Sequence, residues 1–283
     1  MTQEANESPE ELIRRFRDTV WAHYRDHGRR MPWRETWDSY RILVSEIMLQ
    51  QTQVSRVRQK YGQFLDAFPS VDALAAASLQ EVLALWQGLG YNRRAKFLHQ
   101  AAIAIVRDYG GRLPESPEEL AELPGIGKNT AGSLAAFAFN RPTVFVETNI
   151  RRACIYWFFP ERAGVPDSEL IPWVEACLDQ ENPREWYYAL MDYGAMLRNI
   201  VGNPNRRSAH YTRQSPFANS TRQVRGRVLR VLTEAGDNHD GSMMVAELCE
   251  AVGFSRERVQ EAVNRLEREG FLTQDEAGVR LNE

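Results

Sequence analysis

The chain has few cysteines and no long hydrophobic run. Its 283 residues include only three cysteines, Cys154, Cys177 and Cys249, and none of them lies between Met196 and Ser242. Cysteines so few and scattered indicate reduced, buried thiols rather than a disulfide framework. No apolar stretch reaches about 18 residues and no basic-then-apolar leader is present, so we expect a cytoplasmic protein that does not enter a membrane.

Acidic residues are also missing from one long stretch. The formal net charge of the chain is only −3, yet residues 198–230 contain eight arginines and no aspartate or glutamate. A charge run often forms only a solvated face, but a one-sign run of this length favours contact with a polyanion. The sequence therefore predicts contacts with the phosphates of a polyanion such as a nucleic acid from this segment, with Arg206, Arg207 and Arg213 as candidates.

A carboxylate interrupts an apolar helix in the first quarter of the chain. Residues 45–53 read SEIMLQQTQ, with apolar residues on both sides of Glu46. Burial without a partner raises the pKa of a carboxyl group, which makes Glu46 a candidate proton donor at neutral pH. The alternative is that Glu46 is a solvated helix residue or one half of an ion pair.

A glycine-rich turn predicts an anion site. Residues 123–132 read LPGIGKNTAG and follow a short predicted helix. The two glycines permit backbone conformations that leave N–H groups free to point at an anion. The helix that follows adds the positive end of its dipole and the charge of a lysine. The candidates for a phosphate contact here are Gly125, Gly127, Lys128, Asn129 and Thr130.

A second carboxylate stands at the end of another apolar run. Residues 141–152 read RPTVFVETNIRR, so Glu147 comes just before a helix that Thr148 or Asn149 can cap. One interpretation is that Glu147 only favours this helix N-terminus through the dipole, worth about 0.3–1 kcal/mol. The other is that Glu46 and Glu147 form a pair, one protonated and one ionised, as cleavage of a glycosidic bond requires.

The chain as a whole is predicted to be mainly α. Amphipathic spacing predicts helices over residues 9–27, 39–53, 54–67, 71–76, 79–86, 92–109, 117–123, 130–139, 149–159, 168–178 and 183–197. From about residue 223 the pattern changes to three helices, the third capped by Ser255, and a short hairpin. Three helices followed by a two-stranded wing is the order of a winged-helix domain.

These motifs resemble the helix-hairpin-helix DNA glycosylase superfamily, and within it the MutY-type adenine glycosylases. The resemblance covers roughly residues 30–200 and is carried by 32–34 (PWR), 45–54 (SEIMLQQTQV), 86–91 (WQGLGY), 123–128 (LPGIGK) and 191–196 (MDYGAM). It implies a two-lobed body followed by the winged-helix domain. The expected parts are a discontinuous helical lobe over 1–30 plus 140–215, a six-helix lobe with the hairpin over 31–139, and the winged-helix domain over 222–283.

The resemblance also implies roles for particular residues. Glu46 would protonate the departing base, and Glu147 would stabilise the cationic sugar, with Asn149 orienting Glu147 or the water. The flipped-out base would enter a pocket. The residues that this implies for the opened DNA stack are Gln51, Thr52 and Tyr91, and those for the base pocket are Trp33, Arg34 and Leu49.

The chain departs from the family pattern at several places. The family's catalytic carboxylate is Asp, and the extra methylene of Glu147 moves the charge by roughly a bond length. Most members hold an iron–sulfur cluster with four cysteines after the segment at 191–196, and this chain has no cysteine there. We therefore predict no cluster, no metal and no other cofactor. The arginine-rich segment stands in place of the cluster loop. The usual domain for oxidised guanine is not recognisable.

One departure concerns the type of reaction. Relatives of the endonuclease III type carry a nucleophilic lysine where this chain has Asn129, so Schiff-base strand cleavage is not expected. The sequence predicts a monofunctional DNA glycosylase of base excision repair that hydrolyses the N-glycosidic bond of a flipped-out adenine in a mispair, with 8-oxoguanine as a candidate opposite base. The expected partner is double-stranded DNA with a mismatched or damaged base, bound by a monomer in the cytoplasm, on the nucleoid if the source is bacterial.

Three alternatives remain open. A thymine or uracil mismatch glycosylase on the same fold is the nearest rival, because relatives with a glutamate at the position of Glu46 accept pyrimidines. A lesion-binding protein without catalysis is suggested by Glu147 and by the missing cluster cysteines. A winged-helix regulator with a recruited DNA-binding body is the third. The retained Glu46 and the intact hairpin argue against the last two.

Overall fold

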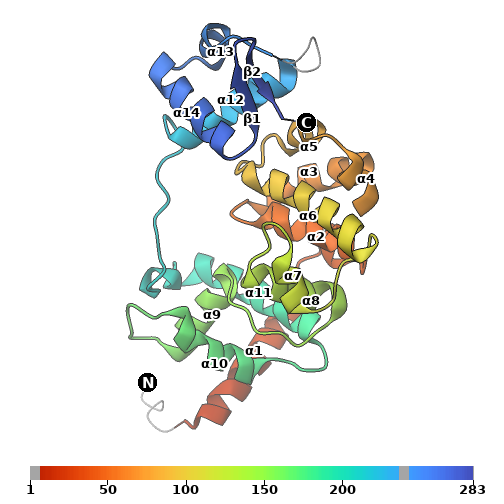
Figure 1. Cartoon of the computed structure of the whole chain (residues 1–283). Coiled ribbons are helices and arrows are strands. Elements are labelled where there is room, and N and C mark those ends of the chain that lie inside the picture. Colours follow the sequence, from red (N-terminus) through yellow and green to blue (C-terminus); the bar gives the residue numbers. More distant parts are fainter. Residues whose placement is uncertain (1–6, 236–241, 283) are drawn as a thin grey trace. The chain divides into compact units, whose positions relative to one another are not determined.

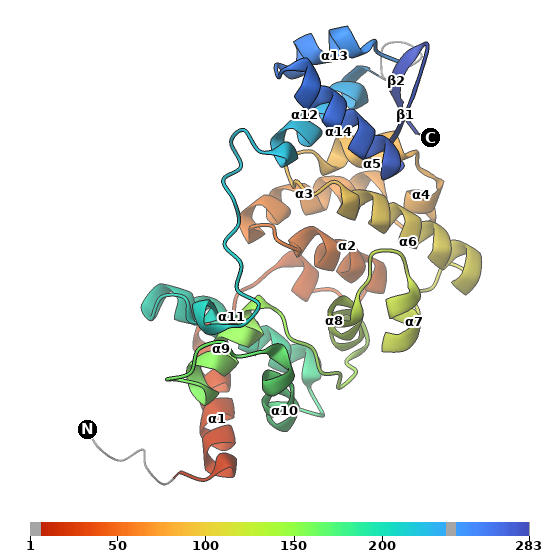
Figure 2. The same ribbon diagram turned by 60° about the vertical axis from the view of Figure 1, so that its left-hand side comes forward.

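The computed structural model describes residues 7–235 and 242–282, which form a mainly helical chain (Figures 1 and 2). These residues divide into two compact units. The first unit holds residues 7–42, 115–122 and 126–213, and the second holds 43–114, 123–125, 214–235 and 242–282. Parts of the predicted domains that fall on residues 1–6, 236–241 and 283 lie outside the described residues, and the predicted boundaries stay a prediction.

In the first unit, several helices pack against one long helix. Its elements are α1 (Pro9–His27), η1 (Pro32–Arg34), α7 (Pro117–Glu122), α8 (Lys128–Phe139), α9 (Thr148–Phe158), α10 (Asp167–Cys177), α11 (Pro183–Ile200) and η2 (Pro204–Arg207). Helices α1, α8 and α9 pack against α11. The ring of Phe16 in α1 lies edge-on to Trp186 and Tyr193 of α11, with centroids 6.1 and 6.4 Å apart. Aromatic side chains therefore fill much of this core.

The second unit joins a set of helices to the C-terminal part of the chain. Its elements are α2 (Ser39–Leu49, from Leu43 onward), α3 (Val54–Ala67), α4 (Val71–Ala76), α5 (Leu79–Trp86), α6 (Arg93–Tyr109), α12 (Thr221–Ala235), α13 (Val245–Val252), α14 (Arg256–Arg268), β1 (Leu272–Asp275) and β2 (Gly278–Leu281). Helices α4 and α5 pack on α6, and α12 packs on α5, as Figure 2 also shows. Trp86 of α5 is fully buried in this core.

The C-terminal segment, residues 214–235 and 242–282, consists of three helices and an antiparallel hairpin. Strands β1 and β2 pair from Leu272 opposite Leu281 to Asp275 opposite Gly278. Lys96 of α6 donates hydrogen bonds of 2.5 and 2.7 Å to the carbonyl oxygens that follow α14, those of Glu269 and Gly270. These two bonds anchor the segment to α6. The element order agrees with the predicted one, and the winged-helix assignment stays a prediction.

The predicted helices are confirmed, and several bounds differ. The bounds of α1, α3, α4 and α5 are those predicted from the sequence. The helix predicted over residues 39–53 ends at Leu49, because Gln51 adopts a left-handed backbone with φ of 53° that cannot continue an α-helix. Helix α11 continues past residue 197 to Ile200. Among the described residues, no helix is long and apolar enough to cross a membrane.

Helix α11 approaches α9 closely at Gly194. A Cβ atom at Gly194 would lie 2.2 Å from the carbonyl oxygen of Asn149. The guanidinium of Arg152 in α9 donates a hydrogen bond of 2.7 Å to the carbonyl oxygen of Gly194. The close approach and the hydrogen bond both depend on the missing side chain, so glycine is required here.

Replacing this glycine is expected to destabilise the first unit. Gly194→Ala forces α9 and α11 apart, and we expect the free energy of unfolding to fall by about 1–3 kcal/mol. Urea unfolding measures the change. Gly62→Ala in α3 is the control, because a Cβ there meets nothing within 4 Å. That variant should gain roughly 0.5–1 kcal/mol from its better helix propensity. Equal effects from the two substitutions would contradict the close approach as the cause.

Candidate functional site

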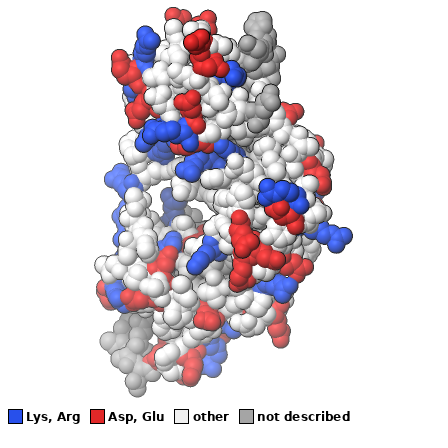
Figure 3. Space-filling view, viewed as in Figure 1, with Lys and Arg blue, Asp and Glu red and all other residues white. Residues whose placement is uncertain are grey.

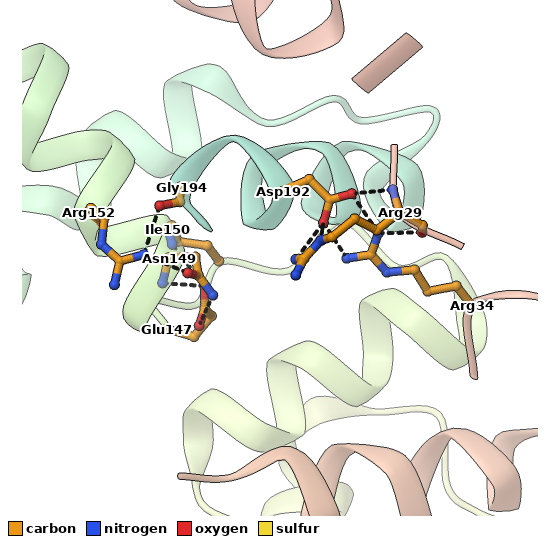
Figure 4. Close-up of polar contacts among 8 residues, drawn as sticks. All are labelled: Arg29, Arg34, Glu147, Asn149, Ile150, Arg152, Asp192 and Gly194. Carbon is orange, nitrogen blue, oxygen red and sulfur yellow. Dashed lines mark hydrogen bonds and ion pairs between the residues drawn. The ribbon is translucent and has the colours of Figure 1, made fainter. Parts of the chain in front are cut away.

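Glu147 caps the N-terminus of α9. Its Oε1 accepts hydrogen bonds of 2.6 Å from the N–H of Asn149 and 2.8 Å from the N–H of Ile150 (Figure 4). The prediction that Thr148 or Asn149 caps this helix is therefore wrong. Both lie inside the helix, and Glu147 holds the extended cap position with φ of −105°. Unpaired N–H groups at a helix start favour a negative charge, which a carboxylate supplies.

A short network fixes the carboxylate from its other side. The amide Nδ2 of Asn149 donates a 3.3 Å bond to Oε2 of Glu147. Arg152 in turn donates to Oδ1 of Asn149 and to the carbonyl oxygen of Gly194, both at 2.7 Å (Figure 4). Glu147, Asn149 and Arg152 therefore form one chain of contacts that ends on α11. Arg152 is 4% exposed and was not a candidate from the sequence.

The protonation of Glu147 depends on opposing effects. Burial raises the pKa of the Glu147 carboxyl above the usual value. The N–H groups of Ile150 and Asn149, and then the charges of Arg152 and Arg151, act against this rise. The carboxyl therefore titrates above the usual range of glutamate while its surroundings are arranged to receive a negative charge. A carboxylate of this kind is suited to stabilise positive charge that develops beside it.

Arg34, a candidate for the base pocket, is held by a buried acid. It donates hydrogen bonds of 2.9 and 2.8 Å to the two oxygens of Asp192 in α11, and Arg29 donates to the same carboxylate (Figure 4). The Asp192 side chain is 1% exposed. Desolvation alone would raise the pKa of Asp192, but the hydrogen bonds and charges of Arg34 and Arg29 hold it below the usual value. Trp33 is buried beside Arg34 in the chain.

In the glycine-rich turn, the predicted glycine-specific backbone is found at Gly125 but not at Gly127, which is extended with φ of −86° and has open space where a Cβ would lie. Gly125 has φ of 76°, and a Cβ there would lie 2.4 Å from the Cβ of Phe97, so no other residue fits without displacement. Gly127 is the N-cap of α8, which therefore starts at Lys128 rather than at the predicted residue 130. Asn129 is tied to the backbone of Val146, with its Nδ2 donating at 3.2 Å to that carbonyl oxygen. The phosphate contact itself stays a prediction.

The other predicted acid, Glu46, lies in α2 and is partly exposed. It makes contacts with its surroundings and is not a free side chain. Leu49, the last residue of α2, is also partly exposed. The roles of Glu46 as proton donor and of Leu49 in the base pocket stay predictions.

Two exposed turn residues share an unusual backbone. Gln51 has φ of 53° and Tyr91 has φ of 50°. Left-handed backbone is uncommon for residues other than glycine and is strained for a bulky one. Gln51 follows α2, and Tyr91, which is 37% exposed, precedes α6. Both turns thus present a large side chain at a strained tip, and such strain is found most often at functional sites.

Arg94 ties these two turns together, and the sequence analysis did not identify it. Arg94 is 8% exposed, and its guanidinium donates hydrogen bonds toward both turns. The acceptors at the end of α2 are the carbonyl oxygens of Ile47 and Met48, at 2.7 and 2.8 Å, and Oγ1 of Thr52 at 2.9 Å. Those before α6 are the carbonyl oxygens of Leu89 and Gly90, at 3.3 and 2.9 Å. Burial lowers the pKa of Arg94 to about 10, so it remains charged at neutral pH.

The arginine-rich segment packs along α9. At one end of this helix, Asn205 donates a 2.9 Å bond to the carbonyl oxygen of Thr148. At the other end, the guanidinium of Arg207 donates to the carbonyl oxygens of Ile155, Phe159 and Pro160. These acceptors lie in the last turn of α9 and directly after it, so Arg207 ties the C-terminal end of the helix to the segment.

The three arginines predicted to contact phosphates differ in their surroundings. Arg207 is engaged with the backbone of its own unit, whereas Arg206 and Arg213 are exposed. Phosphate contacts from all three stay predictions. In the part of the chain that the structure describes, no group of three or more histidine, cysteine, aspartate and glutamate side chains is arranged to hold a metal ion.

Comparisons with known proteins agree with this arrangement. Residues 44–170 match the family described as HhH-GPD superfamily base excision DNA repair protein. The chain is 36% identical over 228 residues to the adenine DNA glycosylase of Mycolicibacterium smegmatis, a match that covers 74% of this chain and 78% of that protein. It is 35% identical over 184 residues to the adenine DNA glycosylase of Buchnera aphidicola subsp. Baizongia pistaciae, which covers 64% of this chain and only 52% of that relative.

A solved structure has a similar fold. The chain aligns with a thermostable thymine-DNA glycosylase with a TM-score of 0.60 and 25% sequence identity. The alignment covers 67% of this chain and 89% of the glycosylase. The fold of most of the chain is thus shared with a DNA glycosylase of known structure.

Replacing Arg94 is expected to loosen both turns at once. In Arg94→Lys, an ammonium group cannot reach all the acceptors that the planar guanidinium reaches. Because buried carbonyl groups then lose their partner, the free energy of unfolding should fall by about 2–3 kcal/mol. Amide exchange should also become faster in residues 50–53 and 88–92.

The neighbouring arginine provides the matched control. Arg93 is largely exposed and lies 4.0 Å from its ionic partner Glu269. Arg93→Lys should change stability by less than about 0.5 kcal/mol. If Arg94→Lys were as stable as the wild type and showed unchanged exchange in both turns, Arg94 would not hold them.

Proposed function

Because the chain belongs to the HhH-GPD superfamily of base excision DNA repair proteins, we propose that it removes adenine from mispairs in DNA. It would hydrolyse the N-glycosidic bond of a flipped-out adenine and leave the sugar–phosphate backbone intact. Relatives named adenine DNA glycosylase support the choice of adenine. We propose guanine or 8-oxoguanine as the opposite base, and double-stranded DNA with such a mispair as the partner of a monomeric enzyme in the cytoplasm or on the nucleoid.

The observation that carries the proposal is the set of hydrogen bonds that hold the Glu147 carboxylate in place. Cleavage of a glycosidic bond passes through a cation-like sugar, which a nearby carboxylate stabilises. Glu147 accepts hydrogen bonds from two backbone N–H groups at the start of α9. The Asn149 side chain donates a further bond to it, and Arg152 holds Asn149 in turn. A carboxylate fixed in this way needs little reorganisation when positive charge develops beside it. Glu147 is therefore the proposed electrostatic partner of the sugar, and Asn149 its positioning residue.

The departing adenine needs a proton, for which Glu46 is the proposed donor. Protonation of a ring nitrogen turns the base into a better leaving group, and a carboxylic acid is a suitable general acid. Gln51, Thr52 and Tyr91 are proposed to enter the base stack, while the turn at Gly125 and Gly127 with Lys128 would bind a phosphate. The strained backbones of Gln51 and Tyr91, and the left-handed backbone of Gly125, support these assignments.

An iron–sulfur cluster has no place in the proposal. Such a cluster takes four cysteine thiolates, and the chain has three cysteines in total. Cys154 and Cys177 are buried in the first unit, where burial raises the pKa of both thiols, and Cys249 lies in α13 of the second. The donor set therefore does not fit the group, and Asn205 and Arg207 supply protein contacts to α9 instead.

A thymine mismatch glycosylase is the second candidate. The similarity in fold and sequence to a thermostable thymine-DNA glycosylase favours it. A lesion-binding protein without catalysis is less well supported. Two N–H groups and Asn149 hold the Glu147 carboxylate in place, as a catalytic role requires.

A panel of duplexes tests the function and separates the two candidates. The protein is incubated with duplexes containing A:G, A:8-oxoguanine, T:G and U:G pairs, and with matched DNA. We expect release of adenine alone, with strand breaks only after alkali treatment. Borohydride should trap no covalent adduct, because Asn129 cannot form a Schiff base. Release of thymine or uracil in preference to adenine would favour the second candidate, and release of no base would refute both.

Removing the charge of Glu147 should abolish most activity. Glu147→Gln keeps an oxygen that can cap α9 but has no negative charge, so the single-turnover rate should fall at least about a hundredfold. Affinity for mispaired DNA should change little, since the charge acts mainly in the transition state. Glu147→Asp is the matched control, because it keeps both the charge and a capping oxygen, and it should retain activity.

The pH dependence gives an independent readout of the same residue. The reaction needs ionised Glu147, and burial raises the pKa of this carboxyl. The rate should therefore fall as the pH decreases, with a midpoint above the usual range of glutamate. Thermal melting must show that both variants remain folded. If Glu147→Gln released adenine as fast as the wild type, Glu147 would be a capping residue only.

A further inference from the structure

The C-terminal segment reaches the turn that carries Tyr91. At the start of α12, Nη1 of Arg222 donates a 3.0 Å hydrogen bond to the hydroxyl oxygen of Tyr91. The guanidinium carbon also lies 5.9 Å from the centroid of the Tyr91 ring, and that of Arg94 lies 5.7 Å from it. The ring of this strained tip is therefore contacted by two arginines, one from the helix that follows it and one from the far end of the sequence.

The position of Arg222 is set by several contacts within the C-terminal segment. Its Nη2 donates a 2.7 Å bond to the carbonyl oxygen of Ser215. The chain just before α12 is held in turn by Arg258 of α14, which donates a 2.6 Å bond to the carbonyl oxygen of Asn219. A cation in the first turn of a helix stands at the unfavourable end of the dipole. Helix stability therefore does not account for an arginine here, whereas its contact with Tyr91 does.

The surroundings of this contact are rich in positive charge. Figure 3 shows Lys and Arg side chains gathered along the edge of the C-terminal segment where α12 begins. Arg225 forms a two-point ion pair with Glu269 at 2.8 and 2.5 Å, and Arg93 lies 4.0 Å from the same carboxylate. One glutamate thus pairs with two arginines, whereas Arg222 donates to neutral groups, the hydroxyl of Tyr91 and the carbonyl oxygen and hydroxyl of Ser215.

From these contacts we propose that Arg222 is a positioning residue for Tyr91. The C-terminal segment thereby contributes to the conformation of the turn that carries Tyr91. Arg222 holds the tyrosine hydroxyl, and so presets the ring for insertion into the base stack. The inference rests on the proposed function. It differs from the view of the segment as an independent module, because it links one residue of α12 to a single side chain of the helical body.

A double-mutant cycle tests whether Arg222 acts through the hydroxyl of Tyr91. The variants are Arg222→Ala, Tyr91→Phe and the double variant, in the full-length protein. Tyr91→Phe keeps the ring and loses only the hydroxyl. Arg280→Ala is the control, because Arg280 is a surface arginine of the same segment paired with Asp275 at 2.7 Å, away from Tyr91. It removes the same charge without touching the turn.

Two readouts keep this test apart from the test of the proposed function. One is the single-turnover release of adenine. The other is the fluorescence of 2-aminopurine placed beside the mispair, which rises when the base unstacks and requires no bond cleavage. Arg222→Ala should lower the rate about tenfold, the usual effect of losing a hydrogen bond from a charged group, and should reduce the fluorescence rise. Tyr91→Phe should do the same, and the double variant should lose no more than either single one.

Several outcomes would overturn the proposal. Additive losses in the double variant, with a weaker salt dependence of binding for Arg222→Ala, would assign Arg222 to a phosphate instead. Equal losses in Arg280→Ala would reduce the effect to net charge. Normal release and fluorescence in Arg222→Ala would remove the role altogether. If the wild type released no base but unstacked 2-aminopurine, the proposed function would fail, and the fluorescence of the four proteins would still decide on Arg222.

Discussion

The start of α9 depends on how closely α11 packs against it. Because Gly194 has no side chain, the backbone of α11 lies against Asn149, and Arg152 can bridge Asn149 and the Gly194 carbonyl. These contacts fix the first turn of α9, whose N–H groups hold Glu147. The geometry of the proposed catalytic carboxylate is therefore a consequence of helix packing. A carboxylate in a flexible loop would have to lose conformational freedom during the reaction, whereas this one has lost it on folding.

In the second unit a buried charge has a comparable role. Removing a guanidinium from water is costly unless its donors find acceptors. Arg94 finds them in the carbonyl groups at the end of α2 and in the turn before α6. Only its Nε lacks a partner. The strained backbones of Gln51 and Tyr91 persist because this network holds the residues beside them.

Much of the fold could be predicted from the sequence because its helices are amphipathic and have clear start and stop signals. Ser8 and Ser78, for example, each form a capping box with a glutamate three residues later, and the predicted bounds of α1 and α5 are the observed ones. The end of α2 was predicted too late, since the left-handed backbone of Gln51 has no local signal, and the residues on either side of it, Met48 and Thr52, are bound by the distant Arg94. Propensity describes neighbours in sequence, and this turn is set by neighbours in space.

The candidate site was predictable to the same extent. Its carboxylates and glycines stand in recognisable segments, but the residues that restrain them do not. Arg94, Arg152 and Asp192 lie inside ordinary helical patterns, and only the folded chain shows that their charges are buried. The cap of α9 was assigned to Thr148 or Asn149 because short polar side chains are the common caps. Glu147 takes that position because it is the residue with extended backbone, and its longer side chain folds back to reach the N–H groups.

Two residues of the arginine-rich segment, Asn205 and Arg207, fix both ends of α9 by hydrogen bonds. Asn205 binds the first residue of α9, and Arg207 binds the carbonyl groups at its end. The two contacts lie at opposite ends of the helix that Glu147 caps. The segment therefore restrains this helix by ordinary hydrogen bonds. Each such bond contributes only about 0.5–1.5 kcal/mol. The restraint must therefore come from several contacts acting together with the packing at Gly194.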